Sequence, residues 1–162
     1  MKVVLISIRP KWCLLISELE KTIEVRKTRP KIETPFKAYI YCTKDALLTK
    51  SHSAGVLYVA ANTKFQKALE DIGNVTYSGK IIGEFVCDWI RTACETVDGL
   101  IDVVDCSNSC LSAKKILNYA DGKPLELWHI SELIIYDKPK ELSKFGLTRA
   151  PQSWCYVEEV AE

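Results

Sequence analysis

Short segments with β-strand patterns run along this chain, and few helical segments separate them. Residues 3–8 (VVLISI) are apolar and β-branched, as in a buried strand, and residues 21–27 (KTIEVRK) alternate between apolar and charged side chains. Further strand patterns are found at residues 36–44, 80–90, 125–137 and 153–160. Because the helices are too few for a doubly wound sheet, we expect an α+β fold, a small mixed β-barrel with flanking helices.

Outside residues 45–78, three segments have helical character. Pro10 suits the first turn of a helix, and the side chains after it follow the spacing of one helical face: Trp12, Leu15, Ile16 and Leu19. Residues 111–122 form a second predicted helix that ends at a glycine, and Pro139 opens a short third one through Phe145.

Length and composition favour one domain over residues 1–162. The chain has 162 residues, of which 48% are hydrophobic, which is enough for one core and short of the length at which cores split. Residues 45–78 begin with a polar stretch and include a predicted helix at 63–73. We interpret this segment as an insertion.

Cysteine usage and hydropathy indicate a cytoplasmic protein. The seven cysteines are an odd number, they form no C-x-x-C pair, and the apolar start is not followed by a small-residue cleavage site. No apolar run approaches the roughly 20 residues that a membrane-spanning helix needs. We therefore expect reduced thiols and no membrane segment.

Charge is distributed unevenly along the chain. Residues 1–50 contain 11 lysines and arginines against 5 acidic residues, a net charge of +6, whereas residues 51–162 carry −5. A local basic surface on a nearly neutral protein fits a local anionic partner such as a nucleotide or RNA. A solvated basic surface without a ligand is the alternative interpretation.

The strongest candidate site lies on the alternating strand at residues 21–27. Alternation puts Glu24 and Arg26 on one face and Ile23 and Val25 on the other, so the two charged side chains can pair or share a ligand. Arg26 offers a planar fork of donors, and Glu24 can accept from an exocyclic amine. Lys21 has the parity of Ile23 and reaches this site only if the strand starts after it. A surface ion pair is the alternative.

Other residues are weaker ligand-binding candidates, and each has a structural alternative. The N-terminus of the first predicted helix suits an anion, an aromatic side chain can stack on a base, and polar side chains near a turn can hydrogen-bond a ligand. Surface charge, core packing and turn formation are the respective alternatives. The candidates in these three classes are Arg9 and Lys11, then Trp128 and Trp154, then Gln152 and Ser153.

No motif indicates a metal or a cofactor. Cys106 and Cys110 form a C-x-x-x-C spacing, but neither a second close pair nor a histidine completes a zinc set. The chain has no Walker loop and no G-x-G-x-x-G, which argues against a nucleoside-triphosphate enzyme or a dinucleotide cofactor. We therefore expect neither metal nor cofactor.

Five segments follow one another in the order typical of the ASCH domain: SIRPKW at 7–12, KTIEVRK at 21–27, GKIIGEF at 79–85, WHISELIIYDKPKELSKF at 128–145 and APQSWCYVEE at 150–159. The chain resembles this family, which belongs to the PUA-like superfamily of β-barrels with flanking helices. The family signature G-x-K-x-x-E-x-R matches Lys21, Glu24 and Arg26, but its glycine falls on Leu19. The resemblance covers nearly all of the chain outside 45–78.

The resemblance implies two function classes. PUA-like domains suggest a module that binds RNA, a modified nucleotide or a nucleoside in a basic cleft. Some small bacterial ASCH proteins are instead amidohydrolases of N4-acetylcytidine that use a lysine, a threonine three residues later and a distant glutamate. Lys21 matches that lysine, but Glu24 replaces the threonine, and the segments before LNYADG do not align well enough to place the distant glutamate. Because a carboxylate cannot replace a hydroxyl nucleophile, the binding module is favoured, and Lys21 and Glu24 are catalytic only if the protein is an enzyme.

Overall fold

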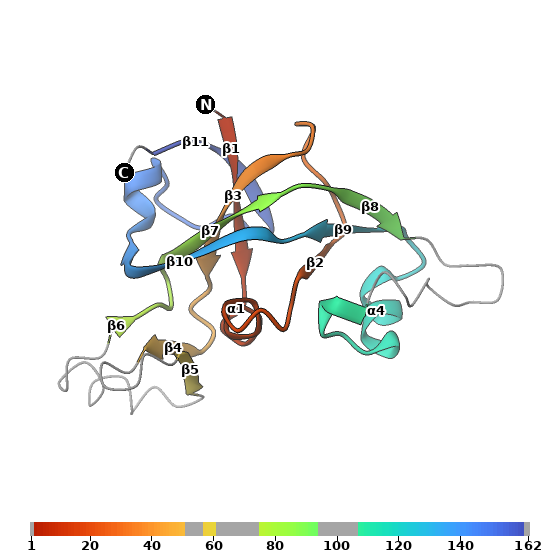
Figure 1. Ribbon diagram of the computed structural model, residues 1–162, viewed down its shortest axis with the longest axis horizontal. Helices are drawn as coiled ribbons and strands as arrows, with labels where there is room; N and C mark the ends of the chain where they lie inside the picture. Colours follow the sequence, from red (N-terminus) through yellow and green to blue (C-terminus); the bar gives the residue numbers. More distant parts are fainter. Residues whose placement is uncertain (1, 51–56, 61–74, 94–106, 161–162) are drawn as a thin grey trace.

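The computed structural model describes residues 2–50, 57–60, 75–93 and 107–160, and its mixture of strands and helices confirms the predicted α+β class. Figure 1 shows the strands crossing in the middle of the molecule, with α1 and α4 outside them. In chain order the elements are β1 (Lys2–Ile8), α1 (Pro10–Ser17), β2 (Ile23–Arg26), β3 (Phe36–Cys42), β4 (Leu47–Lys50), β5 (Leu57–Ala60), β6 (Val75–Thr76), β7 (Ile81–Cys87), β8 (Ile90–Ala93), the 3-10 helix η1 (Ser107–Ser109), α4 (Ala113–Ala120), β9 (Leu125–His129), β10 (Ser131–Lys140), the 3-10 helix η2 (Leu142–Phe145) and β11 (Trp154–Glu158).

The largest sheet has the strand order β10-β7-β3-β1-β11. Its strand β1 is the apolar run predicted from the sequence, and it is parallel to β3 and antiparallel to β11. Successive side chains of β1 enter different core clusters, with Val4 and Ile6 in one and Val3 and Leu5 in another. Apolar residues on both faces therefore bury this strand on both sides, as the continuous hydrophobic pattern predicts.

Gly83 lies where the backbones of β7 and β10 approach each other closely. A Cβ atom at this position would collide with the carbonyl oxygen of Ile134 on β10. The pairing of β3 with β7 also shifts register beside Gly83, between Ile40 and Tyr41. The sequence prediction of a bulge or a close backbone approach at this glycine is confirmed.

A second sheet has the order β2-β9-β8, and it continues the first. Strand β7 leads into β8 and β9 leads into β10, so the two strand pairs form one bent ribbon that belongs to both sheets (Figure 1). The predicted strand at 125–137 is therefore divided at Ile130. Pro139 remains within β10, and the short helix predicted from it begins only at Leu142.

The described strands do not close into the barrel expected from the sequence. Closure would require β2 to pair with β11, but in the described part of the chain β2 is paired with β9 and β11 with β1. Side chains bridge this gap instead: the Trp154 indole donates to Thr28 Oγ1 at 3.0 Å, and the Lys31 amide donates to the Tyr156 hydroxyl at 2.7 Å. We call this side of the molecule the β2–β11 seam.

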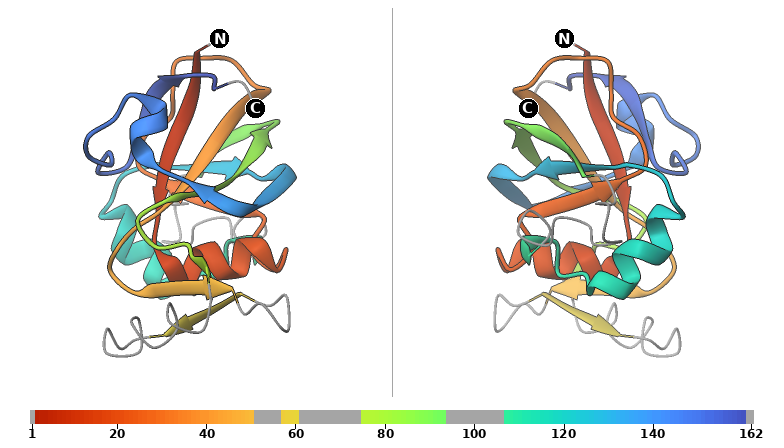
Figure 2. Two further views of the ribbon diagram at one scale, coloured as in Figure 1. Left: turned by 90° about the vertical axis from the view of Figure 1, so that its left-hand side faces the viewer. Right: turned by 90° about the vertical axis from the view of Figure 1, so that its right-hand side faces the viewer.

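Helix α1 buries a face that only partly overlaps the predicted one, because Ile16 belongs to both. Its buried residues are Pro10, Cys13 and Ile16, whereas Trp12 is only partly buried and Leu19 lies beyond the helix with 67% of its surface exposed. The prediction was wrong for Leu19 because the helix ends at Ser17, so the helical spacing no longer applies. Figure 2 shows α1 lying across the ends of the strands, with β4 on its far side.

The other expected elements are found in part. Helix α4 packs Ile116 and Ala120 against a core cluster that includes Leu125 and Leu127. Within the proposed insertion at 45–78, strands β4, β5 and β6 form a small third sheet, and the helix predicted at 63–73 lies outside the described residues. No helix in the described ranges is long and apolar enough to cross a membrane.

Candidate ligand-binding cavity

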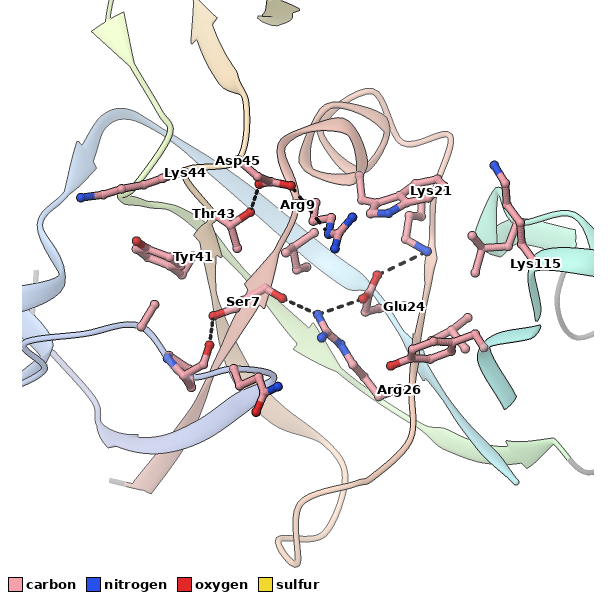
Figure 3. A pocket seen from close by; sticks show the side chains of 18 residues that line it. Ser7, Arg9, Lys21, Glu24, Arg26, Tyr41, Thr43, Lys44, Asp45 and Lys115 are labelled. Carbon is pink, nitrogen blue, oxygen red and sulfur yellow. Dashed lines mark hydrogen bonds and ion pairs between the residues drawn. The ribbon is translucent and has the colours of Figure 1, made fainter. Parts of the chain in front are cut away.

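An open cavity of about 810 Å³ lies between the two sheets, beside the start of α1. The segments around it come from distant parts of the sequence: the end of β1, strand β2, the turn after β3, helix α4 and the loop before β11. Figure 3 shows side chains from these segments around one space. Its lining residues are Ser7, Ile8, Arg9, Trp12, Lys21, Glu24, Val25, Arg26, Tyr41, Thr43, Lys44, Asp45, Leu111, Lys115, Tyr119, Ala150, Pro151 and Gln152.

Three charged side chains from the alternating segment form a row along the cavity. Glu24 lies between Lys21 and Arg26, with its Oε2 3.3 Å from Lys21 Nζ and its Oε1 3.0 Å from Arg26 Nη2. Ile23 and Val25, which point the other way, join the core cluster under α4. The side chains of β2 thus alternate between two faces, as the sequence predicts. Both faces are buried, whereas the alternating pattern is typical of a strand with one face exposed.

Lys21 reaches the row from just before β2. Only 2% of its side chain is exposed, and its Nζ donates to the backbone carbonyls of Ile23 at 2.6 Å and Ser109 at 2.8 Å. Together with Glu24, these carbonyls give the ammonium one acceptor for each of its three hydrogens. The condition set by the sequence, that the strand starts after Lys21, is met because β2 starts at Ile23.

Arg26 joins the two sheets across the seam. Its Nη2 donates to the carbonyl of Ser7 on β1 at 2.6 Å, and its Nη1 lies 3.4 Å from Ser153 Oγ. Ser7 in turn donates from Oγ to the carbonyl of Pro151 at 2.7 Å. The buried Arg26 Nε has no hydrogen-bond partner among the described residues. The guanidinium is therefore fixed at its Nη atoms, while its Nε donor is unused.

The row is a buried ion network. The alternative interpretation from the sequence, a surface ion pair, is therefore excluded. The side chains of Glu24 and Arg26 are only 8% and 11% exposed. Desolvating such charges costs several kcal/mol per ion, so a buried network adds little stability over apolar packing. Two cations against one carboxylate leave the row with a formal charge of +1. This arrangement suits a ligand that brings an acceptor or a negative charge.

Sequence reasoning missed most of the rim of the cavity. Arg9, a predicted site residue, lies there, with its Nε 3.6 Å from an Asp45 carboxylate oxygen that belongs to the turn after β3. Thr43 donates to the same carboxylate. Lys115 and Tyr119 come from α4, far along the chain, and no sequence pattern linked that helix to β2. Lys11, predicted beside Arg9, is exposed and does not line the cavity.

The aromatic side chains at the cavity are not those predicted. Trp128 is fully buried in the core with its ring centroid 5.8 Å from that of Phe36, so the prediction of a stacking surface there was wrong and the core alternative is correct. Trp154 packs 6.1 Å from Trp128 on the seam and also does not line the cavity. Trp12, Tyr41 and the half-exposed Tyr119 line it instead.

The loop before β11 supplies the last predicted residues. Gln152 lines the cavity, and Ser153 lies behind it against Arg26. The Ser153 carbonyl also accepts the Ser7 amide at 2.8 Å, so this loop is attached to the end of β1. One of the two predicted hydrogen-bonding residues is thus available to a ligand, and the other supports the site.

No metal centre is seen in the part of the chain that the structure describes. These residues contain no group of three or more histidine, cysteine, aspartate and glutamate side chains placed to hold an ion. Cys106, of the C-x-x-x-C spacing, lies outside them. Burial, followed by the charge of Asp88, raises the pKa of the Cys87 thiol to about 12, which favours the protonated form and not the thiolate that binds metals.

No family model and no curated protein matches this sequence. Three crystal structures of an ASCH protein from Zymomonas mobilis do match its structure. A tyrosine-to-phenylalanine mutant superposes with a TM-score of 0.61 and 15% identity, over 98% of this chain and 92% of that chain. The chain has the ASCH fold. A serine-to-alanine mutant and the ASCH protein itself each give a TM-score of 0.60 at 14% identity, over 96% of this chain and 88% and 87% of theirs.

The ASCH fold predicted from five sequence segments is thereby confirmed. At this level of identity the similarity concerns the arrangement of the backbone. The signature residues Lys21, Glu24 and Arg26 lie together in the cavity of that fold, and Leu19, at the glycine position of the signature, adopts a positive φ of 60°. The loop before β2 therefore keeps the left-handed conformation that a glycine would favour.

Proposed function

We propose that this protein binds RNA or a nucleotide, with a base held in the cavity. The observation that carries the proposal is the buried row of Lys21, Glu24 and Arg26 along an open cavity. Buried charges are costly and contribute little to folding, which favours a role in recognition. Such a row offers a ligand both hydrogen-bond acceptors and donors, and it carries a net positive charge.

The residues around the row have matching roles in the proposal. Glu24 accepts hydrogen bonds from an exocyclic amine of the base. Arg26 contacts Glu24 and also donates to the Ser7 carbonyl, so it holds the Glu24 carboxylate in place. Tyr119 is 38% exposed and lines the cavity, so its ring is available for stacking on a base. Gln152 can donate or accept at the opposite side.

The alternative is an amidohydrolase that acts on N4-acylated cytidine. In its favour, Lys21 and Glu24 are in contact within the cavity, as a catalytic pair would be. Against it, three acceptors surround Lys21 Nζ, and the position of the expected threonine is Glu24, which offers no hydroxyl nucleophile. The binding module therefore remains our first proposal.

The test is a binding measurement with short single-stranded RNAs and nucleosides, by calorimetry at low salt. We expect RNA affinity to fall as salt rises, because contacts between phosphates and lysine or arginine release counterions. Glu24→Gln removes the carboxylate but keeps the volume, and it should weaken binding by roughly 1–3 kcal/mol. Glu33→Gln, at an exposed carboxylate outside the cavity, is the matched control.

Two further measurements keep this test decisive. Glu24→Gln leaves buried cations without their partner, so its folding is checked by thermal unfolding, and Tyr119→Ala at the exposed rim tests the same cavity without this risk. Absence of binding to every RNA and nucleoside tested would reject the proposal. Incubation with N4-acetylcytidine should release little or no cytidine; robust turnover that Lys21→Ala abolishes would establish the hydrolase instead.

A further inference from the structure

A second open cavity, of about 360 Å³, lies on the large sheet beside its edge strand β10 (Figure 1). It shares no lining residue with the cavity between the two sheets. The side chains that form its walls include Lys37 from β3, Glu84 and Val86 from β7, and Glu132 and Ile134 from β10. We call this second cavity the β10 groove.

The groove lies on the outer face of the large sheet, opposite the core cluster that contains Trp128. Cross-strand pairing puts Tyr39 on β3, Glu84 on β7 and Ile134 on β10 in one row of this outer face. The Phe145 ring of η2 covers one end of the row, with its centroid 4.7 Å from that of Tyr39. Ile134 at the other end is 53% exposed, so this end of the row offers an apolar contact surface.

The charges at the groove leave one carboxylate available. Lys37 Nζ lies between Glu84 at 3.1 Å and Glu159 at 3.0 Å, and Glu84 also accepts from the Tyr136 hydroxyl. Glu132 is exposed and makes no ion pair within the described ranges. The lining has two carboxylates against one ammonium, a net charge of −1. The groove therefore suits an external cation, which would bind at Glu132.

A β-bulge places Glu132 at the groove. From Ser131 to Ile134 the chain of β10 takes three steps, whereas the paired stretch of β7 from Val86 to Glu84 takes two. Within the bulge Glu132 has a φ of 47°, which is uncommon for a residue with a side chain. Leu133 packs against the core cluster, while Glu132 and Ile134 line the groove. A carboxylate and an exposed apolar side chain thus lie two residues apart on an edge strand.

This spacing matches that of an extended peptide, in which every second side chain lies on the same face. An arginine can bind the Glu132 carboxylate through two parallel donors, and an aliphatic side chain two residues away can cover Ile134. We propose that the β10 groove docks an extended basic segment of a partner protein, with an arginine at Glu132 and an aliphatic residue at Ile134. This inference goes beyond the proposed function and does not depend on it.

The test is a titration of isotope-labelled protein with the acetylated and amidated pentapeptide Arg-Thr-Ile-Thr-Arg, followed through the amide resonances by NMR at low salt. An arginine lies two residues from the isoleucine in both directions, so the peptide can bind in either orientation. We expect shifts around Val86, Glu132 and Ile134. Glu132→Gln and Ile134→Thr should each lower the affinity about three- to fivefold, the range for an exposed charge pair or one buried methyl group.

Glu33→Gln, at an exposed carboxylate outside the groove, is the matched control variant, and the same peptide with glutamine in place of both arginines is the control ligand. Absence of shifts in the groove, equal affinity for the two peptides, or a Glu132→Gln variant that binds like the Glu33→Gln variant would overturn this inference. Each of these results would leave the proposed function intact, because that function concerns the other cavity. Groove shifts without any RNA or nucleoside binding would overturn the proposed function alone.

Discussion

Leu19 has a backbone conformation that usually belongs to glycine. Helix α1 ends with the Leu19 amide bonded to the Ile16 carbonyl and the Glu20 amide bonded to the Leu15 carbonyl, each at 3.0 Å. These are the two bonds of a Schellman motif, with Leu19 at the left-handed position, φ 60°. A leucine there is strained by its Cβ atom and, being 67% exposed, gains little from burial.

Leu19→Gly should therefore stabilise the protein. We expect the free energy of unfolding to rise by about 0.5–1 kcal/mol, because relief of the Cβ strain exceeds the entropy that glycine adds to the unfolded chain. Chemical denaturation measures the difference. Leu19→Ala retains a Cβ atom and serves as the control, for which we expect no rise in the free energy of unfolding. A Leu19→Gly variant no more stable than the Leu19→Ala variant would contradict this account of the loop.

At the scale of elements, one carboxylate ties three strands of the large sheet together. Glu84 on β7 lies 3.1 Å from Lys37 Nζ on β3 and accepts a hydrogen bond from the Tyr136 hydroxyl on β10. Burial acts to raise the pKa of Glu84, but the hydrogen bonds from Tyr136 and Lys37 outweigh it, so the pKa lies below its ordinary value of 4.5. The charged carboxylate is thus the form that the folded protein stabilises.

This lowered pKa predicts an acid-sensitive contribution to stability. A carboxylate whose pKa is lower in the folded state stabilises the fold above its ordinary value of 4.5, and this contribution is lost as pH falls through the lowered pKa. Unfolding free energies of the wild type and Glu84→Gln should therefore differ most near neutral pH and converge in acid. Glu132→Gln, at an exposed carboxylate on β10, is the matched control. A wild-type to Glu84→Gln difference independent of pH would exclude this role.

At the scale of the whole molecule, the two sheets are joined differently on their two sides. The bent ribbon of β7–β8 and β9–β10 joins them through backbone pairing, whereas the β2–β11 seam is bridged by side chains. Arg26 is the central bridge, through Ser7 and Ser153. The cavity opens beside this seam, so the same contacts that hold the sheets together also hold the candidate site.

Arg26→Lys should loosen the seam selectively. Lysine keeps the charge but loses the planar fork that contacts Ser7, Ser153 and Glu24 together. We expect amide hydrogen exchange to speed up in β2 and β11 more than in β3 and β7, which lie within the large sheet. Arg29→Lys, at an exposed arginine 4.0 Å from Glu126, is the control. Equal acceleration in all four strands would indicate global destabilisation instead.

The amino-acid pattern by itself determined most of the strands and their faces. Apolar runs and alternation follow from which side chains leave water, so β1, β3 and the opposite orientations of Ile23 and Glu24 could be predicted. The close approach at Gly83 was also predictable, because only glycine has room for a neighbouring backbone. The order of five short segments was sufficient to predict the ASCH fold.

Only the tertiary structure decided what surrounds these elements. Burial of Glu24 and Arg26 depends on α4, the turn after β3 and the loop before β11, and local periodicity cannot specify which distant segments pack over a strand. For the same reason Trp128 belongs to the core while Tyr119 lines the cavity, although both are aromatic residues in amphipathic segments. A side chain's neighbours along the chain fix its direction, but its function depends on the elements that long-range packing brings to that face.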